Sequence, residues 1–181
     1  GCDWDGDGIA DRMESTLYGT NWQEADTDGD GLDDVAIGAR LQSSGAERGG
    51  KAYVIFGDSM VGVEVGSLAD ADVHLPGTAT GGEQGYDIGA VGDLDDDGLN
   101  EIVVGAFHSS REAMVAGEAM VYFGSSLSTH TEILDTEAEI RFISSEVNHL
   151  LGVSVEGNMD LDGNGTMDLV IGASGMAPPT Q

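Results

Sequence analysis

Short apolar runs rich in valine and isoleucine recur along the chain, separated by segments rich in glycine and acidic residues. Runs of about four to eight residues with β-branched side chains, bounded by glycine or aspartate, are typical of β-strands rather than of helices. On this basis we predict strands at residues 34–38, 51–56, 71–75 and 86–91. The pattern indicates an all-β fold built of short antiparallel strands.

The apolar runs belong to a repeat of 67 residues. The Gly-Ala pairs that begin at Gly38, Gly105 and Gly172 lie 67 residues apart, and the segment GGKAYVIFG at 49–57 recurs as AGEAMVYFG at 116–124. Repeats of four strands stack as blades, and about four to eight blades close a propeller. The chain holds about 2.7 repeats. We therefore expect four-stranded antiparallel propeller-type blades with open sheet edges, to which another chain can add a strand.

Four acidic segments share one spacing and begin at Asp3, Asp26, Asp93 and Asp160. Each carries oxygen side chains at positions 1, 3, 5 and 9 and glycine at position 6. A hard cation such as Ca²⁺ takes about six to eight oxygen ligands, and alternate residues on a tight loop can converge on it, with the main-chain carbonyl of position 7 as a further ligand. One acidic loop is often only a solvated turn, but four loops with the same spacing favour cation binding. The predicted side-chain ligands are Asp3, Asp5, Asp7, Asp11, Asp26, Asp28, Asp30, Asp34, Asp93, Asp95, Asp97, Glu101, Asp160, Asp162, Asn164 and Asp168, and the predicted carbonyl ligands are those of Ile9, Leu32, Leu99 and Thr166.

The residues that follow the loops distinguish the first loop from the other three. Position 12 of the first loop is Glu14, which can chelate as in an EF-hand, and the apolar spacing after it predicts a short helix. Position 12 of the other loops is Ile37, Val104 or Ile171, which cannot bind a cation. These three loops run directly into predicted strands. With Glu14 included, we expect about four Ca²⁺ ions per chain.

Net charge and composition narrow the classes of partner. The chain has 34 acidic residues against 6 lysines and arginines, a formal charge of −28. Nucleic acid is excluded as a partner because phosphate binding needs a cationic surface, and no apolar stretch reaches the ~18 residues of a membrane-spanning helix. Cys2 is the only cysteine, so no internal disulfide stabilises the fold. The four histidines form no HExxH motif, and there is no CxxC or nucleophile elbow, so we predict no catalytic residues and no enzyme.

The order FG … GxxV … DxDxDGxxD followed by an apolar run and Gly-Ala resembles the FG-GAP repeat of integrin-α-type β-propellers. The resemblance covers residues 26–173. It implies a four-stranded blade with Ca²⁺ in the loop between two strands, in proteins outside the cell, with the ligands of the last three loops given above. Arg40, Phe107 and Ser174 stand where the family has proline. Glu101 is longer than the usual aspartate, and Asn164 removes a charge, so the resemblance implies different affinities at those two loops.

The first residues are similar to a different family, the bacterial calcium repeats related to thrombospondin type 3. The similarity rests on DWDGDGIADRMESTLYGTN and the acidic loop after it, although Asn21–Trp22 replaces the usual Asp-Pro. We therefore divide the chain into a thrombospondin type 3-like segment at 1–25 and FG-GAP-like repeats at 26–181. The repeats are 26–92, 93–159 and the partial unit 160–181.

These inferences lead to an extracellular or cell-surface calcium-binding protein with a structural or adhesive role. Its expected partner is a protein or glycan ligand at the cell surface, or copies of itself joined through open sheet edges. Two alternatives stay open: the subunit of a self-assembling extracellular filament whose blades are completed by neighbours, and the non-catalytic part of a larger secreted hydrolase.

Overall fold

The computed structural model describes residues 26–61 and 66–175, which form an all-β fold. The first sheet contains β1 (Val35–Gly38), β2 (Lys51–Ile55) and β3 (Val73–Pro76). The second sheet contains β4 (Ile88–Gly92), β5 (Glu101–Ala106), β6 (Glu118–Tyr122) and β7 (Ile140–Ile143). The third contains β8 (Leu151–Met159) and β9 (Asp168–Ala173). Neighbouring strands are antiparallel in all three sheets, as predicted.

Short helical turns follow the second strand of the first sheet and the third strand of the second sheet. These are α2 (Gly57–Met60) after β2 and α3 (Gly124–Leu127) after β6, and a 3₁₀ turn, η2 (Leu68–Asp70), precedes β3. No helix among the described residues is long and apolar enough to cross a membrane.

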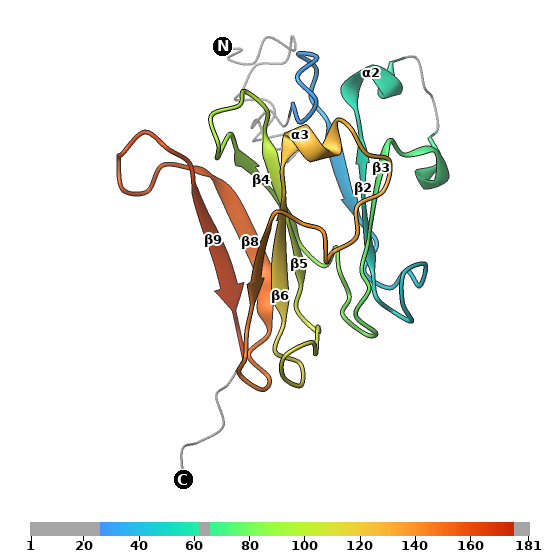
Figure 1. The fold of residues 1–181 in the computed structure, drawn as a ribbon, viewed down its shortest axis with the longest axis vertical. Helices are drawn as coiled ribbons and strands as arrows, with labels where there is room; N and C mark the ends of the chain where they lie inside the picture. The colour runs from blue at the N-terminus through green and yellow to red at the C-terminus, as the bar shows by residue number, and fades with distance from the viewer. Residues whose placement is uncertain (1–25, 62–65, 176–181) are drawn as a thin grey trace, which may run out of the picture.

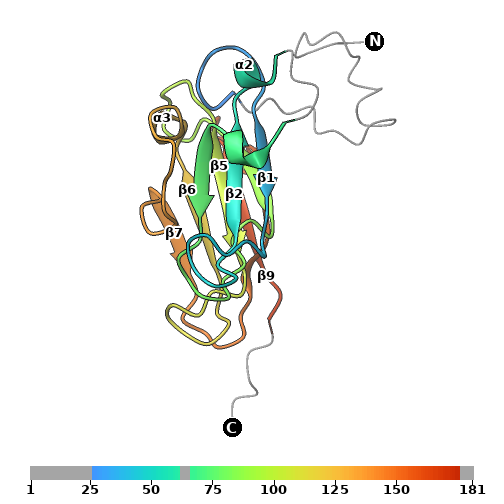
Figure 2. The same ribbon diagram turned by 90° about the vertical axis from the view of Figure 1, so that its right-hand side faces the viewer.

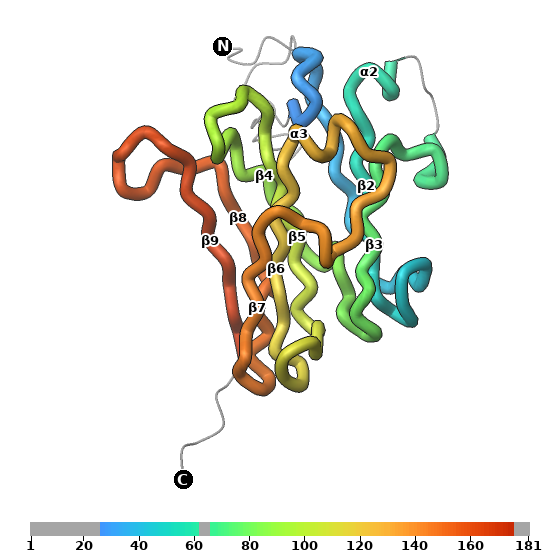
Figure 3. The backbone as a smooth tube through the Cα atoms, viewed as in Figure 1, coloured from blue at the N-terminus to red at the C-terminus, as the bar shows by residue number. Residues whose placement is uncertain are grey.

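The sheets do not begin where the sequence repeat begins. The strand predicted at 86–91 is observed as β4, which pairs with β5 of the following repeat, for example through Ile88 and Val104. β8 pairs with β9 in the same way. The loops at 93–101 and 160–168 therefore join the first strand of a sheet to its second strand, whereas the loop at 26–34 directly precedes β1. All three loops lie at one end of the molecule (Figure 3).

The three sheets stack side by side (Figure 1), and two apolar clusters fill the spaces between them. The cluster between the first and second sheets includes Val54 and Leu75 from one side and Val104 and Tyr122 from the other. The cluster between the second and third sheets includes Val103, Val121 and Val155. Alternate residues of β5 thus face opposite neighbours, because side chains alternate across a strand. Because both faces of β5 are buried, its sequence is a continuous apolar run.

A segment from the second repeat also borders the first sheet. The His74 amide donates to the carbonyl of Thr131, and the Ile133 amide donates to the carbonyl of His74, both at 3.0 Å. These bonds lay residues 131–133 parallel to the outer edge of β3. The chain therefore connects neighbouring sheets by hydrogen bonds as well as by apolar packing. In Figure 2 the first sheet faces the viewer and the other two sheets lie behind it.

The glycines of the first two Gly-Ala pairs, Gly38 and Gly105, permit a close approach between neighbouring segments. A Cβ atom at Gly105 would lie 2.1 Å from the carbonyl oxygen of Gly152, and one at Gly38 would lie 2.2 Å from the carbonyl oxygen of Gly85. Real Cβ atoms essentially never come this close to a backbone oxygen. The glycine therefore has a packing cause at these two positions, whereas a Cβ atom at Gly172 would lie no closer than 3.2 Å to its nearest neighbour, the Ser154 side chain.

Candidate metal centres

Three acidic loops, at 26–34, 93–101 and 160–168, form the candidate site. In each loop, three carboxylates from positions 1, 3 and 9 bring one oxygen apiece within 4.8 Å of the others. The groups are Asp26, Asp28 and Asp34; Asp93, Asp95 and Glu101; and Asp160, Asp162 and Asp168. The structure thus brings together nine of the predicted side-chain ligands in three equivalent sets.

The backbone of each loop folds around its first aspartate. Both carboxylate oxygens of Asp26 accept backbone N–H groups, from Gly29 at 2.6 Å and Gly31 at 3.0 Å. Asp93 and Asp160 accept the equivalent amide of position 6, from Gly98 at 2.9 Å and Gly165 at 2.8 Å. The position-6 glycine has a positive φ in all three loops, which glycine adopts at little cost. Local sequence therefore specifies the tight turn.

The carboxylate at position 9 ties the loop to the rest of its sheet. One oxygen of Asp34 accepts the Thr27 backbone N–H at 2.7 Å and the Thr27 hydroxyl, while the other accepts the Gly57 backbone N–H at 2.9 Å, where α2 begins. Glu101 repeats this arrangement with Leu94 at 2.6 Å and Gly124 at 3.3 Å, where α3 begins. The glycine of each FG dipeptide is thereby hydrogen-bonded to a predicted metal ligand. Sequence spacing alone did not reveal this connection.

The third loop has a weaker attachment. Asp168 accepts the Leu161 backbone N–H at 2.7 Å, which matches the first of the two contacts made by Asp34 and Glu101. Asp34 is 9% exposed and Glu101 is fully buried, whereas Asp168 is half-buried. The three position-9 carboxylates therefore share a place in the loop but differ in environment.

Burial and mutual repulsion raise the pKa of several of these carboxyl groups. Burial is the largest cause at Asp34 and at Glu101, where the charges of Asp95 and Asp97 add to it. The pKa of Asp28 is raised by burial and by neighbouring aspartates. Asp160 differs, because backbone N–H donors, chiefly that of Gly165, lower its pKa. A bound divalent cation would relieve the repulsion among the carboxylates.

Basic side chains lie elsewhere among the described residues. The ion pairs of residues 26–61 and 66–175 are formed with Glu83, Glu118 and Asp135, and none of them involves a predicted ligand. Three converging carboxylates without a basic neighbour form an all-oxygen donor set, which suits a hard divalent cation. The residues present therefore fit Ca²⁺.

The remaining predicted ligands have separate positions. Asp97 accepts the Leu99 backbone N–H at 2.8 Å, and the amide oxygen of Asn164 accepts that of Thr166 at 2.7 Å. Asp30 groups with Asp28 and with Asp58 of α2, which sequence analysis did not single out because it lies outside the loop motif. The carbonyl ligands Leu32, Leu99 and Thr166 stay predictions. The predicted ligands of the first loop, Asp3, Asp5, Asp7, Ile9, Asp11 and Glu14, lie outside the described residues.

Neighbouring loops are in direct contact. The Asn100 backbone N–H donates to the carbonyl of Asp26 at 3.1 Å. The Leu99 side chain reaches over Gly29, where a Cβ atom would lie 2.7 Å from a Leu99 methyl group. The first two loops therefore pack against each other, so their conformations are coupled.

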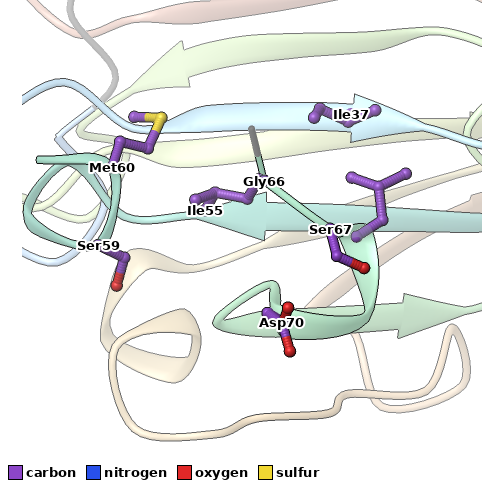
Figure 4. Close-up of a pocket in the computed structure, with 8 residues that line it drawn as sticks. Ile37, Ile55, Ser59, Met60, Gly66, Ser67 and Asp70 are labelled. Carbon is purple, nitrogen blue, oxygen red and sulfur yellow. The ribbon is translucent and has the colours of Figure 1, made fainter. Parts of the chain in front are cut away.

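An apolar groove lies on the face of the first sheet that points away from the second. Ile37 and Ile55 point into it from neighbouring strands, with Met60 and Leu68 at its border (Figure 4). Ile37 and Ile55 occupy the repeat positions of Val104 and Tyr122, which are fully buried between two sheets. By its place in the repeat, this face is one that packs against another sheet.

Comparison with known proteins identifies relatives that align with most of the chain. No protein-family model matches the chain. It is 30% identical to integrin alpha-5 of Xenopus laevis over 171 residues, 32% identical to human integrin alpha-11 over 166, and 29% identical to human integrin alpha-8 over 167. These alignments cover 89–90% of this chain but only 13–15% of each relative. They confirm the predicted FG-GAP-type repeats and fit the all-β fold, while the thrombospondin type 3-like segment at 1–25 stays a prediction.

Proposed function

We propose, from the premise that this chain consists of FG-GAP-type repeats, that it is part of an extracellular β-propeller that binds Ca²⁺ through its acidic loops and acts in adhesion. The convergence of three carboxylates in each of three equivalent loops is the observation that carries the calcium proposal. The similarity to integrin alpha chains supports adhesion at the cell surface, with a protein or glycan ligand and without enzymatic activity.

Each ion would be held by the carboxylates of positions 1, 3 and 9, with the side chain of position 5 and the carbonyl of position 7 completing the coordination. The ion supplies positive charge that offsets the repulsion among these groups. In the first two loops, the position-9 carboxylate also accepts the N–H of Gly57 or Gly124. Binding at the loop would thus stabilise the start of α2 or α3. The same chemistry applies to the loop that begins at Asp3, which gives about four ions per chain.

The expected affinity of the loops for Ca²⁺ indicates where the protein acts. Extracellular calcium modules bind with Kd of about 10⁻⁴–10⁻³ M, so millimolar Ca²⁺ fills them whereas micromolar Ca²⁺ does not. The chain lacks a disulfide that could replace the ions as a stabilising element, because Cys2 is its only cysteine. We therefore place its function in a calcium-rich extracellular environment.

A second candidate is a filament whose sheets are completed by neighbouring copies. The apolar face at Ile37 and Ile55, which no other sheet of the described residues covers, favours it, since the equivalent residues Val104 and Tyr122 are buried by another sheet. Sedimentation velocity over a hundredfold concentration range, in millimolar Ca²⁺, separates the two candidates. A filament subunit gives species that grow with concentration, whereas the proposed propeller segment stays a monomer.

Isothermal titration calorimetry of the calcium-free chain tests the calcium proposal. We expect the wild-type chain to take up about four Ca²⁺ ions. The triple variant Asp28→Asn, Asp95→Asn and Asp162→Asn should take up about one. Circular dichroism in millimolar Ca²⁺ shows whether that variant retains its sheets. Mg²⁺ should produce little heat, because it prefers rigid octahedral coordination and retains its waters. A wild-type chain that takes up no Ca²⁺ would refute the proposal.

A further inference from the structure

The segments between β1 and β2, between β3 and β4, and after β5 carry a cluster of charged and aromatic side chains. The backbone of these segments lies at the end of the molecule opposite the acidic loops (Figure 3). The centre of the cluster is Glu83, which is 2% exposed. The Glu83 carboxylate accepts hydrogen bonds from Arg40 at 2.5 Å and Arg48 at 2.6 Å, and His108 of the neighbouring repeat lies 3.4 Å away. The cluster therefore spans the boundary between the first two sheets.

Aromatic rings extend the cluster along the same boundary. The Arg40 guanidinium lies 5.6 Å from the ring centroid of Tyr86. Tyr86 contacts Phe107 at a centroid distance of 4.1 Å, and Phe107 stacks on His108 at 3.9 Å. Tyr86 is 42% exposed, and the Arg40 and Arg48 side chains are 46% and 59% exposed. Both guanidinium groups and one ring are therefore accessible from solvent.

The repeat itself shows that the fold does not need these charges. Phe107, Val115 and Leu150 occupy the positions that Arg40, Arg48 and Glu83 occupy one repeat earlier. The backbone is the same at both places: φ is +49° at Arg48 and +51° at Val115, and +56° at Glu83 and +58° at Leu150.

A backbone hydrogen bond is also shared. The Glu83 N–H donates to the Arg48 carbonyl at 3.2 Å, and the Leu150 N–H donates to the Val115 carbonyl at 3.4 Å. The same backbone conformation therefore forms with charged side chains in the first repeat and with apolar side chains in the second. A buried ionic cluster is seldom more stable than an apolar replacement, so stability alone does not account for the two arginines.

The cluster contains the most exposed lysine or arginine side chains of the described residues. The described residues contain five lysines and arginines. Lys51 is buried, and Arg111 and Arg141 are 22% and 24% exposed and paired with Glu118. Arg40 and Arg48 are therefore the most exposed basic side chains of the described residues, and with His108 they share the single carboxylate of Glu83. This leaves local positive charge on a chain whose formal net charge is −28.

We propose that Arg40, Arg48, Tyr86, Phe107 and His108 form a docking surface for a protein segment that presents one or two carboxylates beside an aromatic residue. Guanidinium groups match carboxylates through paired N–H donors, and exposed aromatic faces accept stacked rings. A long polyanion such as a sulfated glycan fits less well, because most of its charges would face the acidic remainder of the chain within a Debye length of about 8 Å. A short acidic segment meets only the local positive charge.

The residues of the second repeat indicate a variant that removes the charged cluster. The triple substitution Arg40→Phe, Arg48→Val and Glu83→Leu installs the apolar trio of the second repeat and changes the net charge by −1. Ala69→Glu, on the exposed η2 turn, makes the same charge change away from the cluster. Melting followed by circular dichroism in millimolar Ca²⁺ verifies that both variants fold. If the triple variant does not fold, Arg48→Val replaces it, since Arg40 remains paired with Glu83; this single substitution should weaken binding, and unchanged binding would overturn the proposal.

Fluorescence anisotropy with a labelled peptide, Gly-Tyr-Glu-Tyr-Asp-Gly, measures docking at 0.15 M salt. We expect saturable binding to the wild-type chain and to Ala69→Glu, and at least roughly tenfold weaker binding to the triple variant. The neutral peptide Gly-Tyr-Gln-Tyr-Asn-Gly should also bind at least roughly tenfold more weakly. With Glu83→Gln, binding of the acidic peptide should be retained or strengthened, because a competing carboxylate charge is removed.

Four results would overturn the proposal: no binding of the acidic peptide, equal binding of the neutral peptide, equal binding by the triple variant, or tighter binding of a heparin hexasaccharide than of the peptide. Self-association that the triple variant abolishes would also overturn it, by assigning the surface to a second copy of the chain. The test is independent of the calcium proposal, since it compares variants that share the same acidic loops.

Discussion

Truncation of the position-9 carboxylate should affect the first loop far more than the third. Asp34→Ala removes the acceptor of the Thr27 N–H, the Thr27 hydroxyl and the Gly57 N–H. Asp168→Ala removes the acceptor of the Leu161 N–H, in a more exposed setting. Both substitutions remove one charge from the same loop position, so they are matched controls for each other.

The size of the effect follows from these contacts. Leaving a buried donor without a partner costs about 1–3 kcal/mol. Three donors are affected at Asp34, but burial also raises the pKa of this carboxyl group and offsets part of the gain. We therefore expect the free energy of unfolding to fall by roughly 2–4 kcal/mol for Asp34→Ala and by about 1 kcal/mol for Asp168→Ala.

Differential scanning calorimetry in excess EDTA measures the difference without a contribution from bound metal. For a chain of this size, 1 kcal/mol shifts Tm by about 2–4 °C. The Asp34→Ala variant should therefore melt at least about 3 °C below the Asp168→Ala variant. Equal melting temperatures, or a lower one for Asp168→Ala, would refute the structural role assigned to the contact between position 9 and the FG glycine.

Three further predictions address the loops, the ionic cluster and the close packing. Asp95→Asn should weaken calcium binding measured by calorimetry, whereas Asp96→Asn should not, because Asp96 lies outside the converging carboxylates and asparagine tolerates its φ of +61°; equal losses would contradict the ligand assignment. Burial alone would raise the pKa of Glu83, but Arg40 and His108 outweigh it and lower this pKa below 4.5. The ionised cluster therefore stabilises the fold above about pH 4.5 and loses this contribution as pH falls through the lower folded-state pKa, so acid should destabilise the wild-type chain more than Glu83→Gln in urea titrations. Gly105→Ala should lower the free energy of unfolding by more than about 3 kcal/mol, while Gly66→Ala, with nothing within 4 Å of the added Cβ, should change it by less than about 1 kcal/mol; similar urea midpoints for the two would contradict the close approach of neighbouring segments.

The sequence predicted the features that depend on local spacing. The loop spacing, the glycine at position 6 and the β-branched runs each act within a few residues, and the 67-residue repeat made them unambiguous. The strands predicted at 51–56 and 71–75 appear as β2 and β3 with ends shifted by one or two residues. The FG-GAP resemblance identified the fold family because it combines these local features in a fixed order.

Features that depend on contacts between distant residues could not be predicted in the same way. The strand at 86–91 pairs with the following repeat, and hydrogen bonding between repeats is not encoded in the spacing within one repeat. The grouping of Asp58 with Asp28 and Asp30 depends on how α2 folds back towards the loop. Arg40, Arg48 and Glu83 escape a search for repeated motifs, because the next repeat has apolar residues at all three positions.

Thermal melting of the full chain in 2 mM CaCl₂ and in excess EDTA tests the central claim most directly. At a Kd of about 10⁻⁴ M, RT ln(1 + [L]/Kd) gives roughly 1.8 kcal/mol for each filled site, or about 5 kcal/mol for the three described loops. We predict that EDTA lowers Tm by at least about 10 °C, that added Ca²⁺ but not Mg²⁺ restores it, and that the variant with Asn at Asp28, Asp95 and Asp162 responds only weakly. Superimposable wild-type melting curves in CaCl₂ and EDTA would contradict the claim and would show that the acidic loops are solvated turns.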